Sequence, residues 1–331
     1  MRMLQSVTDC SRQTLAFMAF MCVMLVATSA CATVLSPGNY RVGQIIEPQE
    51  KTTLSDREFR AILQSADIIY IGEAHYTPSH VEAALQVLQS VVNGGRKPVL
   101  GMEMFSWDGQ AGLDRYLTGA VTSTEDFLTE SHWKNNWGGK YADYSPLVDF
   151  AKTHDLTLLG LNPPRPLVRN VAKQGLAAIE SSPEGSPALT GGWTIPVPFP
   201  DDDPEYRRVI YDQIEQCHAG LSQEVYEKIY EASVFRDEGM ASVISTTVKS
   251  EMPARTTFVS YTGAGHIQYG LPIPKRVQRQ LGAPVKDVTV YLHALDPEHP
   301  EDVDHLIDER IADYVWLTAL GPQGRQPRCG E

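Results

Sequence analysis

Two short Gly-x-x-His turns constrain the fold of this 331-residue chain more than any other feature, because each follows an apolar, β-branched run. The first turn is Gly72–His75, the second is Gly263–His266, and a third apolar run ends at Glu103. The three runs cover residues 68–71, 257–261 and 98–102. As neighbouring parallel strands, they would bring two histidines and two carboxylates, Glu73 and Glu103, to one edge of a sheet. Open α/β folds bind ligands at that edge, outside the carboxyl ends of the strands.

The patterns between these runs predict an α/β fold. Residues 79–92 carry apolar side chains at helical spacing between two strand candidates. Further buried-strand patterns cover residues 156–161, 287–292 and 314–317. Alternating strands and helices imply right-handed crossovers and a mainly parallel sheet. We predict one α/β domain over residues 52–320, with a central, mainly parallel sheet flanked by helices. A mainly helical insertion, at about residues 166–251, should cover the C-terminal strand ends.

Composition narrows the class of partner. The formal net charge is −13 and the sequence pI is about 5.2. Both values argue against nucleic acid or an anionic membrane surface as the main partner. The sequence also lacks the Gly-x-Ser-x-Gly elbow, the P-loop, the Gly-x-Gly-x-x-Gly fingerprint and the His-Glu-x-x-His motif. The functional hypotheses therefore rest on the strand-end residues.

The N-terminus has the pattern of an export signal. Arg2 and Arg12 flank the start of the chain, and an uncharged apolar run follows over residues 15–26. Small residues come next, which completes the basic, apolar and small-residue order of a signal peptide. We predict that residues 1–30 are this signal, since the apolar run is too short for a transmembrane helix.

The residues at the end of this signal resemble a bacterial lipobox, in which a cysteine is acylated and becomes the new N-terminus. Cys31 stands in that position, so we expect it to be lipidated and residues 31–51 to form a tether. Thr28 replaces the usual Leu, and ordinary signal cleavage stays open as the alternative. Ala32 favours the outer membrane by the same resemblance, with the protein facing the periplasm.

Two cysteines, Cys217 and Cys329, remain in the predicted mature chain. An exported protein can pair them in a disulfide. However, Cys329 belongs to a polar tail, residues 321–331, which we expect to be mobile, so free thiols are the alternative. No Cys-x-x-Cys or Cys/His spacing of a structural zinc site occurs.

The strand-end residues His75, His266, Glu73 and Glu103 are the candidates for chemistry. Neutral imidazole is a common metal ligand and an acid or base near physiological pH. Two histidines with two carboxylates suit a divalent transition metal or general acid–base catalysis. For any one of them, a hydrogen-bonded loop residue is the alternative interpretation.

Other side chains near the strand ends could take part in ligand binding. His80 follows His75 by five residues and could reach the same pocket. Tyr76 and Tyr269 lie beside the two turns, and a phenolate can bind ferric haem iron. Arg165 follows a strand candidate and could hold carboxylates such as haem propionates through bidentate hydrogen bonds. Packing or solvated surface positions are the alternative for each.

Several short motifs occur together along the chain. They are Ile71-Gly72-Glu73-Ala74-His75, His80, Gly101-Met102-Glu103-Met104-Phe105, Leu161-Asn162, Asp237-Glu238-x-Met240-Ala241 and the segment from Gly263 to Pro274. In this order they resemble the ChaN-like haem-binding lipoproteins, from about residue 65 to 275. The wider superfamily includes erythromycin esterases and the Tiki/TraB group, in which paired Gly-x-x-His turns and a Glu are proposed metalloprotease elements.

The resemblance implies an α/β core with a helical insertion, anchored to the outer membrane and linked to haem or iron uptake. In that family two haems are thought to stack face to face in a homodimer, with tyrosine ligation. An outer-membrane haem receptor is the partner that such a role suggests. Tyr76 follows His75 where relatives often have an Asp and then an aromatic residue, so the tyrosine that ligates iron stays open.

We therefore favour a haem-binding protein over an enzyme. The haem hypothesis uses His75, Tyr76, His80, Arg165, His266 and Tyr269 as cofactor-binding residues and Cys31 as the lipid anchor. The alternative is a metal-dependent hydrolase, a peptidase or an esterase, with His75, His266, Glu73 and Glu103 as catalytic residues or metal ligands. A catalytically silent periplasmic scaffold is the third hypothesis.

Overall fold

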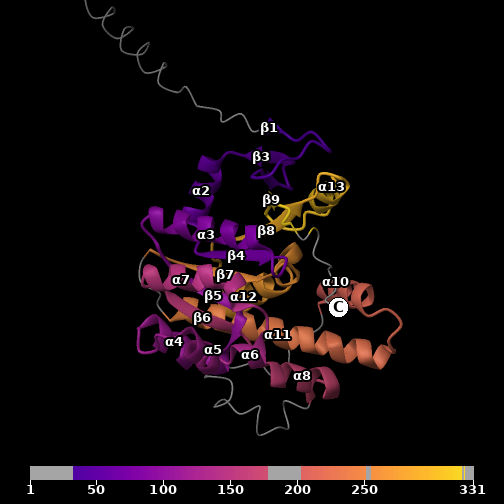
Figure 1. Cartoon of the computed structure of the whole chain (residues 1–331). Coiled ribbons are helices and arrows are strands. Elements are labelled where there is room, and N and C mark those ends of the chain that lie inside the picture. The colour runs from indigo at the N-terminus through magenta and orange to yellow at the C-terminus, as the bar shows by residue number, and fades with distance from the viewer. Residues whose placement is uncertain (1–32, 178–202, 251–254, 323, 325–331) are drawn as a thin grey trace, which may run out of the picture. The chain divides into compact units, whose positions relative to one another are not determined.

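The computed structural model describes residues 33–177, 203–250, 255–322 and 324 (Figure 1). The predicted signal peptide, the predicted lipidation site Cys31 and most of the predicted tail lie outside the described residues. The strands are β1 (Thr33–Val34), β2 (Ile45–Glu47), β3 (Thr52–Leu54), β4 (Ile68–Glu73), β5 (Lys97–Ser106), β6 (Thr157–Asn162), β7 (Thr256–Gly263), β8 (Asp287–Leu295) and β9 (Tyr314–Ala319). The α-helices are α2 (Asp56–Ser65), α3 (Pro78–Asn93), α4 (Gln110–Leu117), α5 (Thr124–Glu130), α6 (Trp133–Asn136), α7 (Ser145–Thr153), α8 (Arg165–Gln174), α10 (Pro204–Cys217), α11 (Gln223–Lys249), α12 (Ile273–Leu281) and α13 (Glu301–Asp308). Short 3-10 helices are η1 (Trp107–Gly109), η2 (Tyr141–Asp143), η4 (Ala264–His266) and η5 (Gln268–Gly270).

A block of parallel strands forms the centre of the sheet. From β3 onward the strands lie in the order β3-β2-β9-β8-β4-β7-β5-β6. β4 pairs in parallel with β7 and β8, β5 pairs in parallel with β6 and β7, and β8 pairs in parallel with β9. β2 pairs antiparallel with both β3 and β9. The predicted α/β fold with a central, mainly parallel sheet is confirmed.

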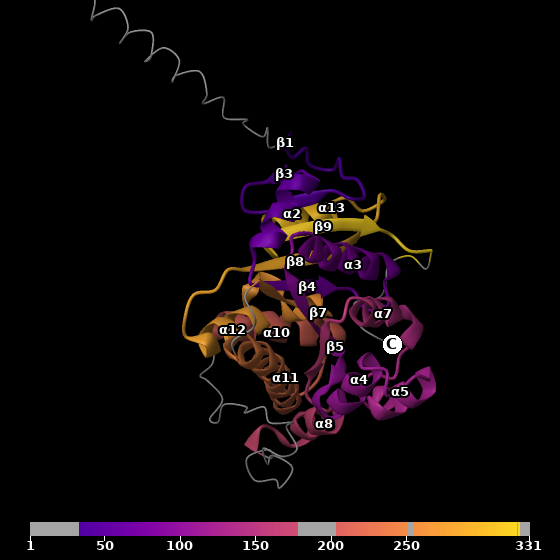
Figure 2. The ribbon, with the colours of Figure 1, turned by 90° about the vertical axis from the view of Figure 1, so that its left-hand side faces the viewer.

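Helices cover both faces of the sheet, because successive residues of a strand point to opposite sides. On β4, Ile69 and Ile71 belong to the apolar cluster that α3 and α7 complete. Ile68 and Tyr70 belong to the cluster on the other face, with α11 and α12. Figure 2 shows α3 and α7 on one side of the central strands and α11 and α12 on the other. A strand buried on both faces needs an unbroken apolar run, which residues 68–71 supply.

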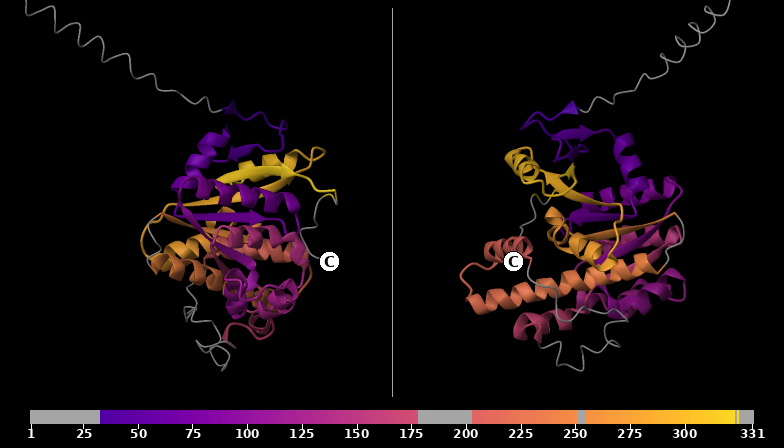
Figure 3. Two further views of the ribbon diagram at one scale, coloured as in Figure 1. Left: turned by 60° about the vertical axis from the view of Figure 1, so that its left-hand side comes forward. Right: turned by 180° about the vertical axis from the view of Figure 1, so that it is seen from behind.

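The long helix α11 both packs on the sheet and reaches the strand ends (Figure 3). Met240 and Ile244 in its second half join the apolar cluster beneath the sheet. Arg236 and Asp237, one turn earlier, contact Glu103 and His266 at the strand ends. The predicted helical insertion contains α8, α10 and α11, and residues 178–202 between α8 and α10 lie outside the described residues.

The N-terminal residues before the predicted domain contribute to the sheet. Residues 45–47, which the sequence analysis assigns to a tether, form β2, and Ile45 and Ile46 are buried. β2 pairs with β9 through Ile45 and Trp316, so the ordered fold begins before residue 52. Two apolar residues between polar neighbours are too short a run to predict a strand, because the pairing partner supplies most of the stabilisation.

Two further observations bear on the sequence predictions. Cys217 at the end of α10 is disulfide-bonded, and its partner lies outside the described residues. Among the helices in the described ranges, none is both long enough and apolar enough to cross a membrane. The predicted export signal is not part of those ranges.

Candidate functional site

The carboxyl ends of β4, β7 and β5 lie side by side and carry the candidate residues. The register of β4 and β7 pairs Gly72 with Thr262 and Glu73 with Gly263, so the two Gly-x-x-His turns begin one residue apart along the sheet. β5 pairs with β7 as far as Met102, and the next residue, Glu103, accepts a hydrogen bond from the Gly263 N–H. The structure thus brings Glu73, His75, Glu103 and His266 to one edge of the sheet, which we call the strand-end site.

Glu73 and His75 form the first of two carboxylate–imidazole pairs in this site. His75 Nδ1 lies 2.7 Å from Glu73 Oε1, and the Tyr144 and Tyr261 hydroxyls donate to the Glu73 carboxylate at 3.0 and 2.5 Å. Burial raises the pKa of Glu73 although these hydrogen bonds lower it. Burial alone would lower the pKa of His75, but the hydrogen bond to Glu73 and the charge of Glu103 raise it above its ordinary value. These shifts favour a proton held between the two side chains.

Two hydrogen bonds hold the backbone of the first Gly-x-x-His turn. The Ala74 N–H donates to His80 Nδ1 at 2.9 Å, and the Tyr76 N–H donates to the Tyr144 hydroxyl oxygen at 3.1 Å. Tyr76 has a φ of 61°, a left-handed conformation that a residue with a Cβ atom rarely adopts. Because Tyr144 contacts both Glu73 and Tyr76, one buried phenol fixes the carboxylate and the strained turn together.

His80 supports the turn from inside the protein. Its side chain is fully buried, and burial lowers its pKa to about 3, so the ring is neutral. Because Nδ1 accepts a hydrogen bond, the ring proton resides on Nε2, which has no partner among the described residues. The structure therefore places His80 as a support of the turn, without an available lone pair for a ligand.

His266 forms the second pair, within a more extended ionic network. Its Nδ1 lies 2.5 Å from Asp237 Oδ1 and its Nε2 lies 3.4 Å from Glu103 Oε1. The Arg236 guanidinium donates to Glu103 Oε1, and the Gly263 N–H donates to Oε2 at 2.6 Å. Burial would raise the pKa of Glu103, but His266 and Arg236 hold it well below its usual range. Burial would lower the pKa of His266, but the two carboxylates raise it to about 9.

Glycine residues allow the two turns to pack against each other. A Cβ atom on Gly263 would lie 2.9 Å from His75 Cε1 and 3.0 Å from its Nε2. A Cβ atom on Gly72 would lie 2.8 Å from the Cα atom of Ala264 and 2.7 Å from Ile267. Each glycine therefore makes room for the other turn, which explains why both turns begin with this residue.

Aromatic side chains extend the site toward solvent. The ring of His75 lies 4.9 Å from that of Trp137, and Tyr76 lies 6.2 Å from Trp137, both measured between centroids. We call His75, Tyr76 and Trp137 the aromatic platform. Tyr76 is 40% exposed, and its hydroxyl passes over Gly139, where a Cβ atom would lie 2.6 Å away. Burial and Glu73 raise the pKa of Tyr76, while the positive charge of Arg165 lowers it, which places Arg165 within electrostatic reach.

The structure does not bring Tyr269 into the strand-end site. Its hydroxyl donates to Glu309 at 2.6 Å, and its N–H donates to the Ile311 carbonyl at 2.6 Å. Its ring packs against the apolar cluster that α13 completes. Tyr269 has a φ of 56° inside η5, and this left-handed residue reverses the chain after His266.

Four residues of the site were not among the functional residues predicted from the sequence: Tyr144, Tyr261, Arg236 and Asp237. Asp237 also accepts a hydrogen bond from the buried Tyr206 hydroxyl at 2.6 Å. The available signal was the run of three charged residues from Arg236 to Glu238 inside the apolar stretch of α11, since buried charges need partners, and Asp237 also begins one of the family motifs. Tyr144 had no comparable signal, because its contacts depend on how α7 docks.

The predicted divalent-metal ligands are already engaged with one another. The His75 and His266 Nδ1 atoms face carboxylates, and donors from tyrosine, arginine and backbone occupy the Glu73 and Glu103 oxygens. Across the described ranges, no group of three or more His, Cys, Asp or Glu side chains is arranged to hold a metal ion. The divalent-metal alternative therefore gains no support.

A family comparison defines the class of protein. The sequence model of the ChaN family, described as haem-binding uptake proteins of the Tiki superfamily, matches residues 60–277. The match spans β4 to β7, the strand-end site and α11. The chain therefore belongs to the ChaN haem-binding uptake family.

The chain is also similar to individual proteins. The structure of ChaN from Campylobacter jejuni, described as binding haem cofacially, is similar with a TM-score of 0.60 and 18% identity, over 82% of this chain and 95% of that one. A mutant of the erythromycin esterase EreC in its open conformation has a TM-score of 0.40 and 14% identity, over 74% of each chain. Protein RETICULATA-RELATED 5, chloroplastic, from Arabidopsis thaliana is 24% identical over 280 residues, 80% of this chain and 35% of that protein. The chain thus spans about a third of that curated relative.

Proposed function

We propose that this protein is an exported haem-binding lipoprotein that takes part in iron uptake, with the aromatic platform as its haem site. Membership of the ChaN family supports haem as the ligand. The observation in this chain that carries the proposal is Tyr76, a partly exposed phenol held in a left-handed turn beside His75 and Trp137. The hydrolase alternative is not favoured, because the matching family model describes haem uptake.

The platform fits the chemical parts of a haem. The Trp137 ring offers a flat surface for an apolar macrocycle, with the His75 ring set at 86° to it, and the Tyr76 hydroxyl is of the ligand type that binds ferric haem iron. Arg165 is exposed, and its guanidinium can hold a propionate through charge-assisted hydrogen bonds. When bound, the group supplies a ferric centre whose charge favours the phenolate form of a tyrosine. Tyr269, which donates to Glu309, is not part of this proposal.

The buried groups behind the platform keep its residues in position. Tyr144 accepts from the Tyr76 N–H and so holds the phenol of Tyr76 on the solvent side of the turn. Glu73 fixes the plane of the His75 ring through Nδ1. Support of this kind lowers the ordering free energy on binding, since the side chains already have the required orientation.

We further propose a homodimer, with Cys31 lipidation and an outer-membrane location facing the periplasm. The platform borders one face of a flat ligand, so a second copy would cover the opposite face. The cofacial haem named for ChaN of Campylobacter jejuni supports this arrangement by analogy. An outer-membrane haem receptor is the partner proposed to supply the ligand. The export pattern of residues 1–30 supports the location.

Hemin titration of the purified mature protein tests the haem proposal. We expect a saturable shift of the Soret band with a fixed stoichiometry, together with a change from monomer to dimer in sedimentation velocity. Iron-free protoporphyrin is the matched comparator, because it has the macrocycle and the propionates but no metal. Binding of protoporphyrin as tight as that of hemin, or no saturation with hemin, would contradict iron ligation at this site.

A further inference from the structure

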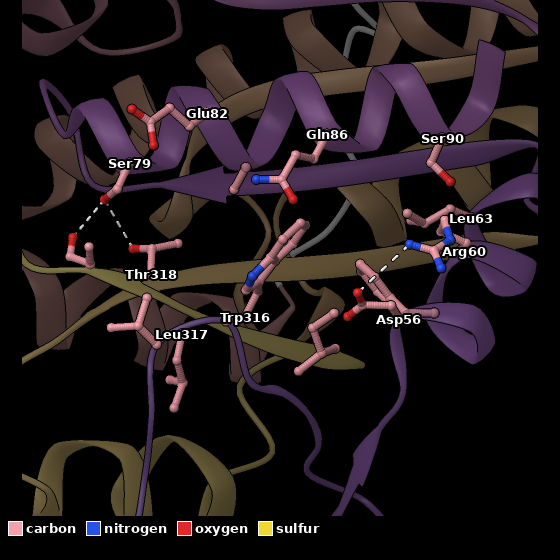
Figure 4. Close-up of a pocket in the computed structure, with 16 residues that line it drawn as sticks. Asp56, Arg60, Leu63, Ser79, Glu82, Gln86, Ser90, Trp316, Leu317 and Thr318 are labelled. Carbon is pink, nitrogen blue, oxygen red and sulfur yellow. Dashed lines mark hydrogen bonds and ion pairs between the residues drawn. The ribbon is translucent and has the colours of Figure 1, made fainter. Parts of the chain in front are cut away.

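A groove between α2, α3 and β9 carries its own set of polar groups (Figure 4). It has a volume of about 320 Å³. Its apolar base includes Phe59, Leu63 and Trp316, and the Phe59 and Trp316 rings are in edge contact at 5.5 Å. None of the residues of the strand-end site lines it.

The polar side of the groove is a row along α3. Glu82, Gln86 and Ser90 follow one another at a spacing of four residues, which places them on one helix face. At a rise of about 1.5 Å per residue, the row extends over about 12 Å. Figure 4 shows the Trp316 indole beside this row, between Glu82 and Asp56.

The Ser90 hydroxyl is evidence for a ligand that is independent of the polar row. Its side chain is only 4% exposed and lines the groove, and its hydroxyl has no hydrogen-bond partner among the described residues. A buried hydroxyl without a partner is unfavourable, so a ligand group that hydrogen-bonds to Ser90 would remove that penalty. The nearby Ser79 hydroxyl, by contrast, already donates to the Ala319 carbonyl at 2.7 Å.

The charged side chains that line the groove indicate the charge of that ligand. Glu82 is exposed and has no ion-pair partner in the described part of the chain, and Asp56 lies 3.8 Å from Arg60 with both side chains largely exposed. Arg60, held near Asp56, is the cation among the groove-lining residues. Carboxylates on both sides of an indole favour a cation, and the indole face adds a cation–π attraction.

We propose that this groove binds a linear aliphatic polyamine. One ammonium would pair with Glu82, another with Asp56 or the Ser90 hydroxyl, and the methylene stem would lie over Trp316. The groove is at the lower end of the size range for small-molecule sites, which suits a slender chain better than a ring system. The proposal is independent of haem binding, because it uses none of the strand-end residues.

Isothermal titration of the full-length mature protein with spermidine tests the proposal. The net charge of −13 attracts polyamines without specificity, so the comparison needs a matched control. Glu82→Gln should weaken spermidine binding about three- to tenfold, whereas Glu215→Gln, the same charge change at an exposed site on α10, should leave it within about twofold. Ser90→Ala should also weaken binding, with the far-UV circular dichroism unchanged.

Three results would overturn the assignment. Equal weakening by Glu82→Gln and Glu215→Gln would reduce the binding to general attraction by net charge. Displacement of spermidine by magnesium chloride at equal ionic strength, to the same extent in wild type and Glu82→Gln, would do the same. Equally tight binding of a lysine-rich tripeptide would show that the groove takes peptide side chains instead of a free polyamine.

Discussion

The substitution Tyr144→Phe removes one hydroxyl that makes two hydrogen bonds behind the platform. The hydroxyl donates to Glu73 at 3.0 Å and accepts from the Tyr76 N–H at 3.1 Å, and the side chain is fully buried. A hydrogen bond to a charged group contributes about 1.5–3 kcal/mol and a neutral one about 0.5–1.5 kcal/mol. We therefore expect the free energy of unfolding to fall by about 2–4 kcal/mol, measured by urea denaturation at pH 7. Hemin affinity should fall as well, because Tyr76 loses the support of its left-handed conformation.

The control for this variant is Tyr70→Phe on β4. Tyr70 is equally buried, but its hydroxyl has no hydrogen-bond partner within the described residues. Removing that hydroxyl should leave stability unchanged or raise it by about 1 kcal/mol, with hemin binding unaltered. If Tyr144→Phe lowered the free energy of unfolding by no more than Tyr70→Phe does, the role assigned to Tyr144 would be wrong.

Three further predictions concern the strand-end site. His266 has a folded pKa of about 9 against an ordinary value of 6.5, so its contribution is complete below pH 6.5 and is lost as pH rises through 9. The free energy of unfolding of the wild type should therefore fall by up to about 3 kcal/mol between pH 6.5 and pH 9. A wild-type free energy that does not change with pH over this range, as in His266→Gln, would refute this. Gly263→Ala places a Cβ atom about 3 Å from the His75 ring, and it should lower the free energy of unfolding by about 1–3 kcal/mol; a melting temperature equal to wild type would disprove the close packing. Gly139→Ala places a Cβ atom against only the hydroxyl end of the Tyr76 ring, so hemin affinity should drop while the melting temperature stays near wild type. The reverse pattern would count against the platform.

The central strands could be predicted from the sequence because both of their faces are buried. β4, β5 and β7 each show an apolar run, and the two Gly-x-x-His turns place the ends of β4 and β7 within one residue of the observed register. The hairpin of β2 and β3 could not be predicted, since each strand has three residues and β2 joins the sheet through its pairing with β9. Short edge strands carry too little pattern to distinguish them from a tether.

The site residues likewise divide into those that the sequence could predict and those that it could not. Glu73 ends β4, Glu103 lies in the last part of β5, and His75 and His266 follow β4 and β7, so parallel topology alone brings them to one edge. Tyr144 lies in the turn just before α7 and Arg236 lies on α11, and the docking of both helices depends on the whole core. No local pattern therefore indicates where their side chains point. Tyr269 lies close to His266 in sequence, but the left-handed turn at η5 directs it toward α13.

Hemin titration of three matched proteins tests the central claim most directly: wild type, Tyr76→Phe and Tyr226→Phe. Tyr226 is a partly exposed tyrosine on α11 whose hydroxyl donates to the His218 carbonyl, away from the platform. The account predicts that Tyr76→Phe loses the wild-type Soret shift and binds hemin at least about tenfold more weakly, a difference of about 1.4 kcal/mol, while Tyr226→Phe titrates as wild type. A wild-type spectrum and affinity in Tyr76→Phe would contradict haem ligation on the aromatic platform.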